Sequence, residues 1–548
     1  MVGLAVELVL NQRQICDLEL ILNGGFAPLT GFLGQADYES VVSAMRLANG
    51  QLWPMPIVLD VSEAYADRLA LGTTLELRDP EGLHLANLSV AEIWRPDRAV
   101  EARSVYGTED QEHPGVAHLL QKTHPVYISG QLEKVALPHH YDFRHLRDTP
   151  AELKAKFEKL GWKRIVAFQT RNPMHRAHLE LTFSAAKNCE ANLLLHPVVG
   201  MTKPNDVDHY TRVRCYEHLI KHFPEQTTML SLLPLAMRMA GPREALWHAL
   251  IRKNYGATHF IIGRDHAGPG KDKQGNNFYD PYAAQELVAR HADEIGIEAV
   301  TFREMVYVQD LDQYVQEHEV SPGQTVQSIS GSELRRRLQE GLEIPAWFTY
   351  PQIEAELRKT YPPKHKQGFT VLFTGLSGAG KSTLANALMI KLMQQGGRSV
   401  TLLDGDIVRK QLSSELGFSR EHRNLNVLRI GFVASEITKA GGIAICAPIA
   451  PYAATRQLVR EQVNQYGGYI EVYVSTPIEI CEARDRKGLY AKARKGELEK
   501  FTGISDPYEA PQEADICIDT SDTGTDKAIQ MILQKLTSRG YLHSADRI

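Results

Sequence analysis

The sequence predicts a multidomain α/β protein, and three observations support that fold class. From about residue 150 onward, apolar strand-like runs alternate with helix-like segments, a rhythm typical of parallel, doubly wound sheets. A glycine-rich phosphate-binding signature at 375–382 directly follows the apolar run 371–373. The region before residue 145 holds many short alternating apolar stretches, which predict a mostly β domain with some helix. A chain of 548 residues has room for three or four domains that each bury their own core.

The composition narrows the class of protein. Hydrophobic residues make up 43% of the chain and charged residues 23%, and the net charge of −5 offers no basic field for nucleic acid or anionic membrane. The six scattered cysteines include no C-x-x-C pair, so we expect neither a disulfide framework nor a structural zinc site. The apolar N-terminus carries Glu7 and no basic stretch, which disfavours a signal peptide, and no apolar run is long enough to span a bilayer. We therefore expect a soluble, cytoplasmic protein without nucleic-acid or membrane partners.

The same patterns predict the elements in order. The β region has a helical candidate at 37–47. The alternating region predicts helices at 151–160, from the motif described below to 187, at 208–222 and at 243–255, with strands at 163–168, 192–196, 228–233 and 258–262. A short helical appendage follows at about 324–360, and the two prolines of 362–366 indicate a linker rather than a helix. The C-terminal region predicts strands at 369–374, 399–403, 443–447, 470–474 and 516–518.

The first candidate site follows the strand at 163–168 and reads Gln169-Thr170-Arg171-Asn172-Pro173-Met174-His175-Arg176-Ala177-His178. Asn172 is a favoured N-cap and Pro173 a favoured first residue, so we expect a helix to begin there with its N-terminus free to hold phosphate. His175 and His178 then share one helix face and donate hydrogen bonds to triphosphate oxygens, while Arg171 offers a planar fork to an oxyanion. The alternative is a capped helix whose histidines only pack. A zinc pair is disfavoured because no H-E-x-x-H spacing or third ligand is present.

This stretch resembles the signature of ATP sulfurylase, and the resemblance covers about residues 1–360. Further segments agree with that family in order and spacing: 25–32, 196–203, 263–270 and 328–331. The resemblance implies a PUA-like β domain at 1–146, a Rossmann-like nucleotidylyltransferase domain at 147–323, and the appendage and linker at 324–365. The implied reaction is attack of sulfate on the α-phosphorus of ATP, which gives adenylyl sulfate and pyrophosphate.

The resemblance also assigns roles to individual residues. Sulfate is expected at Gln169, Arg171 and the backbone of Ala267, and catalysis at Thr170, Arg171 and Asn172. The residues expected to hold ATP are Asn172, His175, His178, Gly263, Arg264, Asp265, His266 and Val306.

The second candidate site is a complete P-loop between a strand and a helix, the context that its mechanism requires. Its backbone N–H groups form a nest for phosphate, Lys381 neutralises the β- and γ-phosphates, and Ser382 is suited to ligate Mg²⁺. Asp404 and Asp406 follow the next strand, where carboxylates serve Mg²⁺ or accept a hydroxyl proton. An accidental glycine-rich turn is the disfavoured alternative. The residues expected to bind ATP here are Gly375, Leu376, Ser377, Gly378, Ala379, Gly380, Lys381, Ser382 and Thr383.

Beyond the P-loop, the segments 404–409, 423–429, 487–490 and 501–509 resemble adenylylsulfate kinase, which implies a P-loop kinase domain with a parallel sheet at 366–548. By this resemblance Asp406 is the base for the ribose 3′-hydroxyl, and the basic stretch from about 484 to 506 forms a lid. One departure is Ala450, where the family commonly has a serine that has been considered a phosphate acceptor. The residues expected to hold adenylyl sulfate are Asp406, Arg409, Arg423, Asn426, Ile449 and Lys487.

Together the two resemblances predict a bifunctional enzyme of sulfate activation that binds ATP with Mg²⁺, sulfate, adenylyl sulfate and pyrophosphate and forms a homo-oligomer. One alternative is an ATP sulfurylase whose C-terminal domain is only an allosteric sensor. The intact Lys381, Ser382 and Asp406 disfavour it. Another is a nucleotidylyltransferase for a different acceptor, which the segments 196–203 and 263–270 disfavour.

Overall fold

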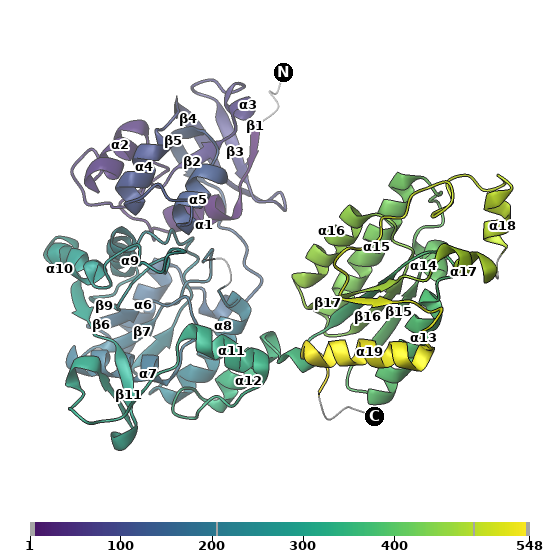
Figure 1. Ribbon diagram of the computed structural model, residues 1–548. Helices are drawn as coiled ribbons and strands as arrows, with labels where there is room; N and C mark the ends of the chain where they lie inside the picture. Colours follow the sequence, from purple (N-terminus) through teal and green to yellow (C-terminus); the bar gives the residue numbers. More distant parts are fainter. Residues whose placement is uncertain (1–5, 204–205, 486–487, 544–548) are drawn as a thin grey trace. The chain divides into compact units, whose positions relative to one another are not determined.

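The computed structural model describes residues 6–203, 206–485 and 488–543 (Figure 1). The chain divides into two compact units. Unit 1 comprises the chain up to Ser330 together with Ile344–Glu356, and unit 2 comprises Gly331–Glu343 together with the chain from Leu357. The two units therefore alternate along the sequence between residues 331 and 356.

The N-terminal part of unit 1 is built on a mixed five-stranded sheet, which confirms the predicted β domain. Its strand order is β1 (Val6–Val9), β3 (Thr74–Arg78), β4 (His84–Trp94), β5 (Val126–Lys134) and β2 (Leu59–Val61). All neighbours are antiparallel except β1 and β3. The accompanying helices are α1 (Gln12–Leu22), α2 (Gln35–Ala44), α3 (Glu63–Ala66), α4 (Arg98–Glu101) and α5 (Pro114–Gln121). The helix expected at 37–47 is α2, which stops at Met45 because that residue adopts a left-handed φ of 59°.

The second part of unit 1 is the predicted parallel sheet. Its order is β10 (Glu298–Thr301), β9 (His259–Ile262), β6 (Ile165–Phe168), β7 (Asn192–Leu195) and β8 (Thr228–Leu230). The chain proceeds from β6 to β8 in one direction and then returns to β9 on the other side of β6, so the order reverses between β6 and β9. Ligands of doubly wound sheets bind at such a reversal, beyond the carboxyl ends of the strands. The connecting helices are α6 (Pro150–Leu160), α7 (Arg176–Asn188), α8 (His209–Leu219), α9 (Pro242–Asn254) and α10 (Ala283–Ile295).

The predicted start of the helix after β6 is wrong: α7 begins at Arg176, not at Asn172. A helix starting at Asn172 needs its carbonyl to accept the N–H of Arg176. Instead the Asn172 carbonyl accepts the hydroxyl of Tyr216 at 2.7 Å, and the Arg176 N–H donates to the carbonyl of Phe348 at 3.1 Å. Tertiary contacts thus override the local preference of Asn-Pro, and His175 becomes the N-cap.

A buried ion pair joins the N-terminal part of unit 1 to the parallel sheet. The guanidinium of Arg238, in the segment before α9, donates to Asp17 of α1 at 2.6 Å, and both residues are buried. The rings of Phe26 and Trp247 lie 5.1 Å apart in the same hydrophobic core. Because a buried charge is tolerated only with a partner, this pair fixes the loop before α9 relative to α1.

The last part of unit 1 is a small antiparallel sheet of β12 (Gln313–Gln316), β11 (Met305–Val308) and β13 (Val326–Gln327). The predicted appendage contains α11 (Gly331–Glu340) and α12 (Pro351–Thr360). The predicted linker at 362–366 is partly regular, because a 3₁₀ turn forms at Lys364–Lys366, directly after Pro363. Within the residues that the structure describes, no helix is long and apolar enough to cross a membrane.

Unit 2 is built around a second parallel sheet, which has the five strands that the sequence predicts. Its order is β15 (Val400–Asp404), β16 (Ile443–Ala447), β14 (Phe369–Thr374), β17 (Gly468–Val474) and β18 (Ile516–Ile518). One hydrophobic cluster joins the sheet to α13 (Lys381–Gln395) and α19 (Thr525–Ser538), and another joins it to α15 (Arg420–Lys439) and α16 (Ala453–Asn464) (Figure 1). The short helices α14 (Gly405–Leu412), α17 (Ile478–Ala483) and α18 (Leu489–Arg494) lie among the loops that follow the strands.

Candidate active sites

Three sequence motifs of unit 1 meet at one edge of its parallel sheet. Residues 169–172 follow β6, residues 196–203 follow β7, and residues 263–268 follow β9. Because these strands are neighbours and parallel, their carboxyl ends lie at the same edge. The structure therefore places the first candidate site at the reversal of strand order.

Arg171 is held by an acidic partner that the sequence analysis did not anticipate. One guanidinium nitrogen of Arg171 donates to both carboxylate oxygens of Asp206, at 2.5 and 2.6 Å. Its carbonyl accepts a hydrogen bond from the buried Arg212. The neighbouring Thr170 hydroxyl bonds both to the amide and to the carbonyl of Asn172, which closes a tight turn. An incoming anion that binds both terminal nitrogens of Arg171 therefore competes with the Asp206 carboxylate for one of them.

His175 and His178 are neutral, and the tautomer of His178 is defined by the backbone. Removal from water lowers the pKa of His175 to about 3 and that of His178 to about 4. The N–H of His175 donates to Nδ1 of His178 at 3.1 Å, so this nitrogen is an acceptor. A neutral imidazole carries a single proton, which for His178 therefore sits on Nε2. Nδ1 of His175 lies 2.9 Å from the hydroxyl of Thr349, a buried residue 174 positions further along the chain.

The turn after β9 is strained, and its residue His266 contacts a row of buried side chains from α9. Asp265 and Ala267 both adopt left-handed backbone conformations, with φ of 51° and 55°, and such strain concentrates at functional sites. Nε2 of His266 lies 3.0 Å from Nδ1 of His248, whose other nitrogen lies 3.3 Å from the carboxylate of Glu244. The three side chains are buried, and desolvation lowers the pKa of both histidines, so they are neutral.

The remaining predicted residues of this site take different positions. Gln169 is buried and makes one weak contact, to the sulfur of Met237 at 3.8 Å. Arg264 is half exposed and pairs with Glu304 at 2.6 Å. Val306 is buried on β11. Gly263 opens the turn directly after β9.

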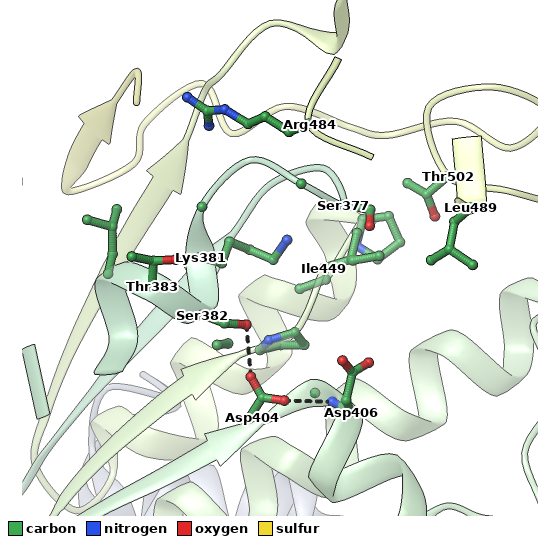
Figure 2. Close-up of a pocket in the computed structure, with 18 of the residues that line it drawn as sticks. Ser377, Lys381, Ser382, Thr383, Asp404, Asp406, Ile449, Arg484, Leu489 and Thr502 are labelled. Carbon is green, nitrogen blue, oxygen red and sulfur yellow. Dashed lines mark hydrogen bonds between the residues drawn. The ribbon is translucent and has the colours of Figure 1, made fainter. Parts of the chain in front are cut away.

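The second candidate site is the P-loop between β14 and α13. Gly375 and Gly378 have φ of 146° and 77°, and a Cβ at Gly375 would lie 2.5 Å from the carbonyl oxygen of Val474. Only glycine fits such a loop, which turns its backbone N–H groups inward. Lys381 is nearly buried, and its ammonium donates to the carbonyls of Gly375 and Leu376 at 2.9 and 2.7 Å. Figure 2 shows this side chain directed into the cavity beside the loop.

The acidic groups follow β15, the next strand along the chain, which is separated from β14 in the sheet by β16. The hydroxyl of Ser382 donates to Asp404 at 2.9 Å, and the other oxygen of Asp404 accepts the N–H of Asp406 at 3.0 Å (Figure 2). Asp404 is thus the N-cap of α14 and leaves the exposed side chain of Asp406 on the first turn of that helix. A hydroxyl beside a carboxylate is a set of hard oxygen donors that fits Mg²⁺.

The residues predicted to hold adenylyl sulfate line the same cavity, which has a volume of about 820 Å³. Arg423 is buried and donates to the hydroxyl of Thr502 and the carbonyl of Lys500. Asn426 is buried with an unpartnered Oδ1 in the described part of the chain, a polar atom suited to a ligand. The carbonyl of Ile449 accepts from Thr374 at 2.7 Å, and Arg409 also lines the cavity. Lys487 lies outside the described residues.

Sequence analysis missed two aromatic residues of this cavity. Phe418 is 62% exposed, although large apolar side chains are usually buried, and the guanidinium of Arg409 lies 4.5 Å from its ring. Phe501 lines the same cavity and packs its ring 5.0 Å from that of Tyr490. An exposed ring beside a half-buried arginine suits stacking of a planar base. Nothing in the one-dimensional pattern separates such a phenylalanine from a core residue.

Two turns suited to phosphate, each at the carboxyl edge of its own parallel sheet, are typical of a two-site transferase acting on nucleotides. Comparison with known families agrees in detail. Residues 4–137 match the PUA-like domain family, residues 144–360 the ATP-sulfurylase family and residues 367–519 the adenylylsulphate kinase family.

Individual relatives align over nearly the whole chain. It is 53% identical over 538 residues to a sulfate adenylyltransferase of Phaeosphaeria nodorum and 54% identical over 539 residues to one of Emericella nidulans. Each alignment covers 98% of this chain and 94% of the relative. A solved structure, the hexameric APS kinase from Thiobacillus denitrificans, is 40% identical with a TM-score of 0.79 and covers 98% of this chain and 94% of its own. The chain belongs to the sulfate adenylyltransferase family, and it carries both an ATP-sulfurylase domain and an adenylylsulfate kinase domain.

The neutral histidines of unit 1 predict a loss of stability in mild acid. Below pH 6.5 an unfolded histidine takes up a proton, whereas folded His175 and His178 stay neutral until about pH 3 and 4, so unfolding takes up protons. The free energy of unfolding should fall by roughly 1–2 kcal/mol per histidine between pH 7 and pH 5. Urea titrations followed by tryptophan fluorescence measure this for unit 1, which contains all five tryptophans. His178→Gln should reduce the pH dependence and His145→Gln, at an exposed position, should not; greater stability at pH 5 would contradict the assignment.

Proposed function

We propose that this chain performs two successive reactions, the formation of adenylyl sulfate from ATP and sulfate and its 3′-phosphorylation by a second ATP. The observation that carries the proposal is the pair of separate phosphate-binding turns with their charged residues in place. The sensor alternative for the C-terminal domain is disfavoured by the geometry of the second site. Lys381, Ser382 and Asp406 all line one cavity with the P-loop.

In the first reaction, the chain positions two anions and neutralises the charge that develops between them. Gln169, Arg171 and the backbone of Ala267 hold sulfate, and Arg171 leaves Asp206 to do so. Thr170 and Asn172 position the α-phosphate, and a sulfate oxygen forms a bond to the α-phosphorus as the bond to the β-phosphate oxygen breaks. His175 and His178 donate hydrogen bonds to the departing pyrophosphate. No covalent intermediate with the protein is required, because positioning and charge neutralisation suffice.

The nucleotide of the first site is also held by the turn after β9. Gly263, Arg264, Asp265 and His266 approach the adenosine, and Val306 supplies an apolar contact from β11. The strained backbone at Asp265 supports this role, since strain of this kind persists where a ligand requires it.

In the second reaction, the P-loop N–H groups from Gly375 to Thr383 hold the ATP phosphates and Asp406 accepts the proton of the ribose 3′-hydroxyl. Lys381 exchanges its bonds to the carbonyls of Gly375 and Leu376 for a contact with the γ-phosphate, whose charge it neutralises. Mg²⁺ bound by Ser382 would supply further neutralisation of the phosphate oxygens. Arg409, Arg423, Asn426, Ile449 and Lys487 hold adenylyl sulfate, and the basic stretch from about 484 to 506 acts as a lid.

The proposal also includes the domain limits, the oligomeric state and the cellular location of the enzyme. We place the domain limits at 1–146, 147–323, 324–365 and 366–548. Each reaction then has a catalytic domain of its own. Homo-oligomerisation is supported by the hexameric relative from Thiobacillus denitrificans. A reducing cytoplasm suits the cysteines, all of which are free and five of which are buried.

Arg171→Ala should lower sulfate-dependent pyrophosphate release about 100-fold or more, because a charged fork in contact with the reacting anion is lost. Phosphorylation of supplied adenylyl sulfate should be unchanged. Both half-reactions are followed separately on one preparation, with Arg95→Ala as a control at an exposed arginine outside the predicted sites. Equal loss of both activities in a folded Arg171 variant would argue against two independent sites.

Lys381→Ala should stop the kinase reaction, again by about 100-fold or more, and leave the sulfurylase reaction intact. Asp406→Asn tests the proton acceptor in the same assay and should lower turnover with little change in KM for ATP. Kinase turnover near the wild-type rate in the Lys381 variant would remove the P-loop from the mechanism. A wild-type C-terminal domain without activity toward adenylyl sulfate would instead favour the alternative in which this domain is an allosteric sensor.

Ala450 lines the cavity and has no hydroxyl, so the kinase should transfer phosphate directly from ATP to adenylyl sulfate. Ala450→Ser should change turnover by less than about threefold, because in-line transfer needs no acceptor on the protein. Incubation with γ-labelled ATP, followed by denaturation, should leave the wild-type protein unlabelled. Stoichiometric label that a chase of adenylyl sulfate removes would disprove direct transfer.

A further inference from the structure

Thr349, which lies outside the signature motifs, bonds through its side chain to His175 of the sulfurylase site. We infer that Thr349 is a positioning residue for the first reaction: its hydroxyl donates a hydrogen bond to Nδ1 of His175 and so keeps the proton of that imidazole on Nε2. This inference rests on the proposed sulfurylase function and assigns to that site a residue that none of its motifs contains.

The geometry ties the ring of His175 to the segment around Thr349. Oγ1 of Thr349 and Nδ1 of His175 lie 2.9 Å apart, and the residues are 2% and 7% exposed. The ring of Phe348 packs against that of His175 with centroids 4.4 Å apart. The carbonyl of Phe348 accepts the N–H of Arg176, the first residue of α7. Three contacts from two consecutive residues thus fix both the helix start and the imidazole.

The direction of the hydrogen bond follows from the number of protons available. Burial lowers the pKa of His175 to about 3, so at neutral pH its ring carries one proton. If that proton were on Nδ1, Thr349 would accept it and Nε2 would present a lone pair, which repels a phosphate oxygen. If Thr349 donates instead, Nε2 carries the proton and serves as a hydrogen-bond donor. The hydrogen bond at one ring nitrogen sets the state of the other.

The neighbouring histidine provides an internal precedent. Nδ1 of His178 accepts the backbone N–H of His175, which leaves Nε2 of His178 as its donor. With Thr349 donating, His175 adopts the same tautomer, and both rings present N–H groups of one kind. Nε2 of His175 makes no hydrogen bond to the residues that the structure describes, so it is available to a ligand.

The position of Thr349 in the chain explains why no motif reveals it. Residues 344–356 belong to unit 1, although the residues on both sides of this segment belong to unit 2. The bond therefore joins the last segment of unit 1 to a residue near the middle of its first segment, 174 positions earlier.

The test compares Thr349→Val, which removes the hydroxyl at nearly constant volume, with Thr349→Ser, which retains it. Thr349→Val should lower the sulfurylase kcat about tenfold, as loss of a partner that orients a functional histidine commonly does, with little change in KM for sulfate. Thr349→Ser should stay near the wild-type rate, and the kinase reaction should be unaffected in both. The matched control is Thr182→Val, since Thr182 is also buried and its hydroxyl bonds only to carbonyls of α7.

The deciding measurement is the tautomer itself, read from ¹⁵N chemical shifts of histidine-labelled full-length protein, with the His175 signals assigned by their loss in His175→Gln. Wild type and Thr349→Ser should show a proton on Nε2, and Thr349→Val a mixture of tautomers. An Nδ1 proton in the wild type overturns the inference, as does a serine variant as slow as the valine variant. So does a valine variant with wild-type kcat and tautomer. If wild type released no pyrophosphate with sulfate, the proposed function would fail, whereas the ¹⁵N spectrum would still decide the direction of this bond.

Discussion

Both active sites depend on one constraint, the place at which the strand order of a parallel sheet reverses. The central strands are β6 in unit 1 and β14 in unit 2. In each sheet the next two strands of the chain lie on one side of the central strand, and the two after them lie on the other side. Ligands of doubly wound sheets bind in the crevice at such a reversal, beyond the carboxyl ends of the strands. In unit 1 the site residues come from the turns after the adjacent strands β6, β7 and β9. In unit 2 Lys381 follows β14 and Asp406 follows β15, with β16 between these two strands in the sheet.

The joining of the two activities in one chain has an energetic basis. A phosphate–sulfate anhydride is a high-energy linkage, and its formation from ATP and sulfate runs uphill unless a product is removed. Phosphorylation at the 3′-hydroxyl removes adenylyl sulfate at the expense of a second ATP. The basic groups of each site donate to acceptors within the chain: Arg171 to Asp206, and Lys381 to the carbonyls of its own loop. Substrate anions therefore exchange with existing contacts rather than neutralise free charges.

The sequence predicted most strands and the turns that follow β6 and β14 because those features depend on local pattern. The apolar runs before Gln169 and Gly375 are buried strands, and the P-loop has the backbone that its glycines require. What it could not predict depends on contacts between distant residues. The helix starts at Arg176 and not at Asn172 because Tyr216 and Phe348 occupy the groups that an earlier start would need. The Asp206 partner of Arg171 and the exposure of Phe418 are likewise tertiary facts.

The alternation of the two units between residues 331 and 356 limits how this protein can be divided or recombined. A sulfurylase ended at Ser330 would lose Phe348 and Thr349, and with them the cap of α7 and the partner of His175. A sulfurylase extended through Thr360, the end of α12, keeps them but takes α11 from the unit to which it belongs. No single breakpoint gives each half all of its own residues. Exchange of one half for a homologous domain by recombination is therefore expected to be tolerated best after α12, with α11 retained from the sulfurylase parent.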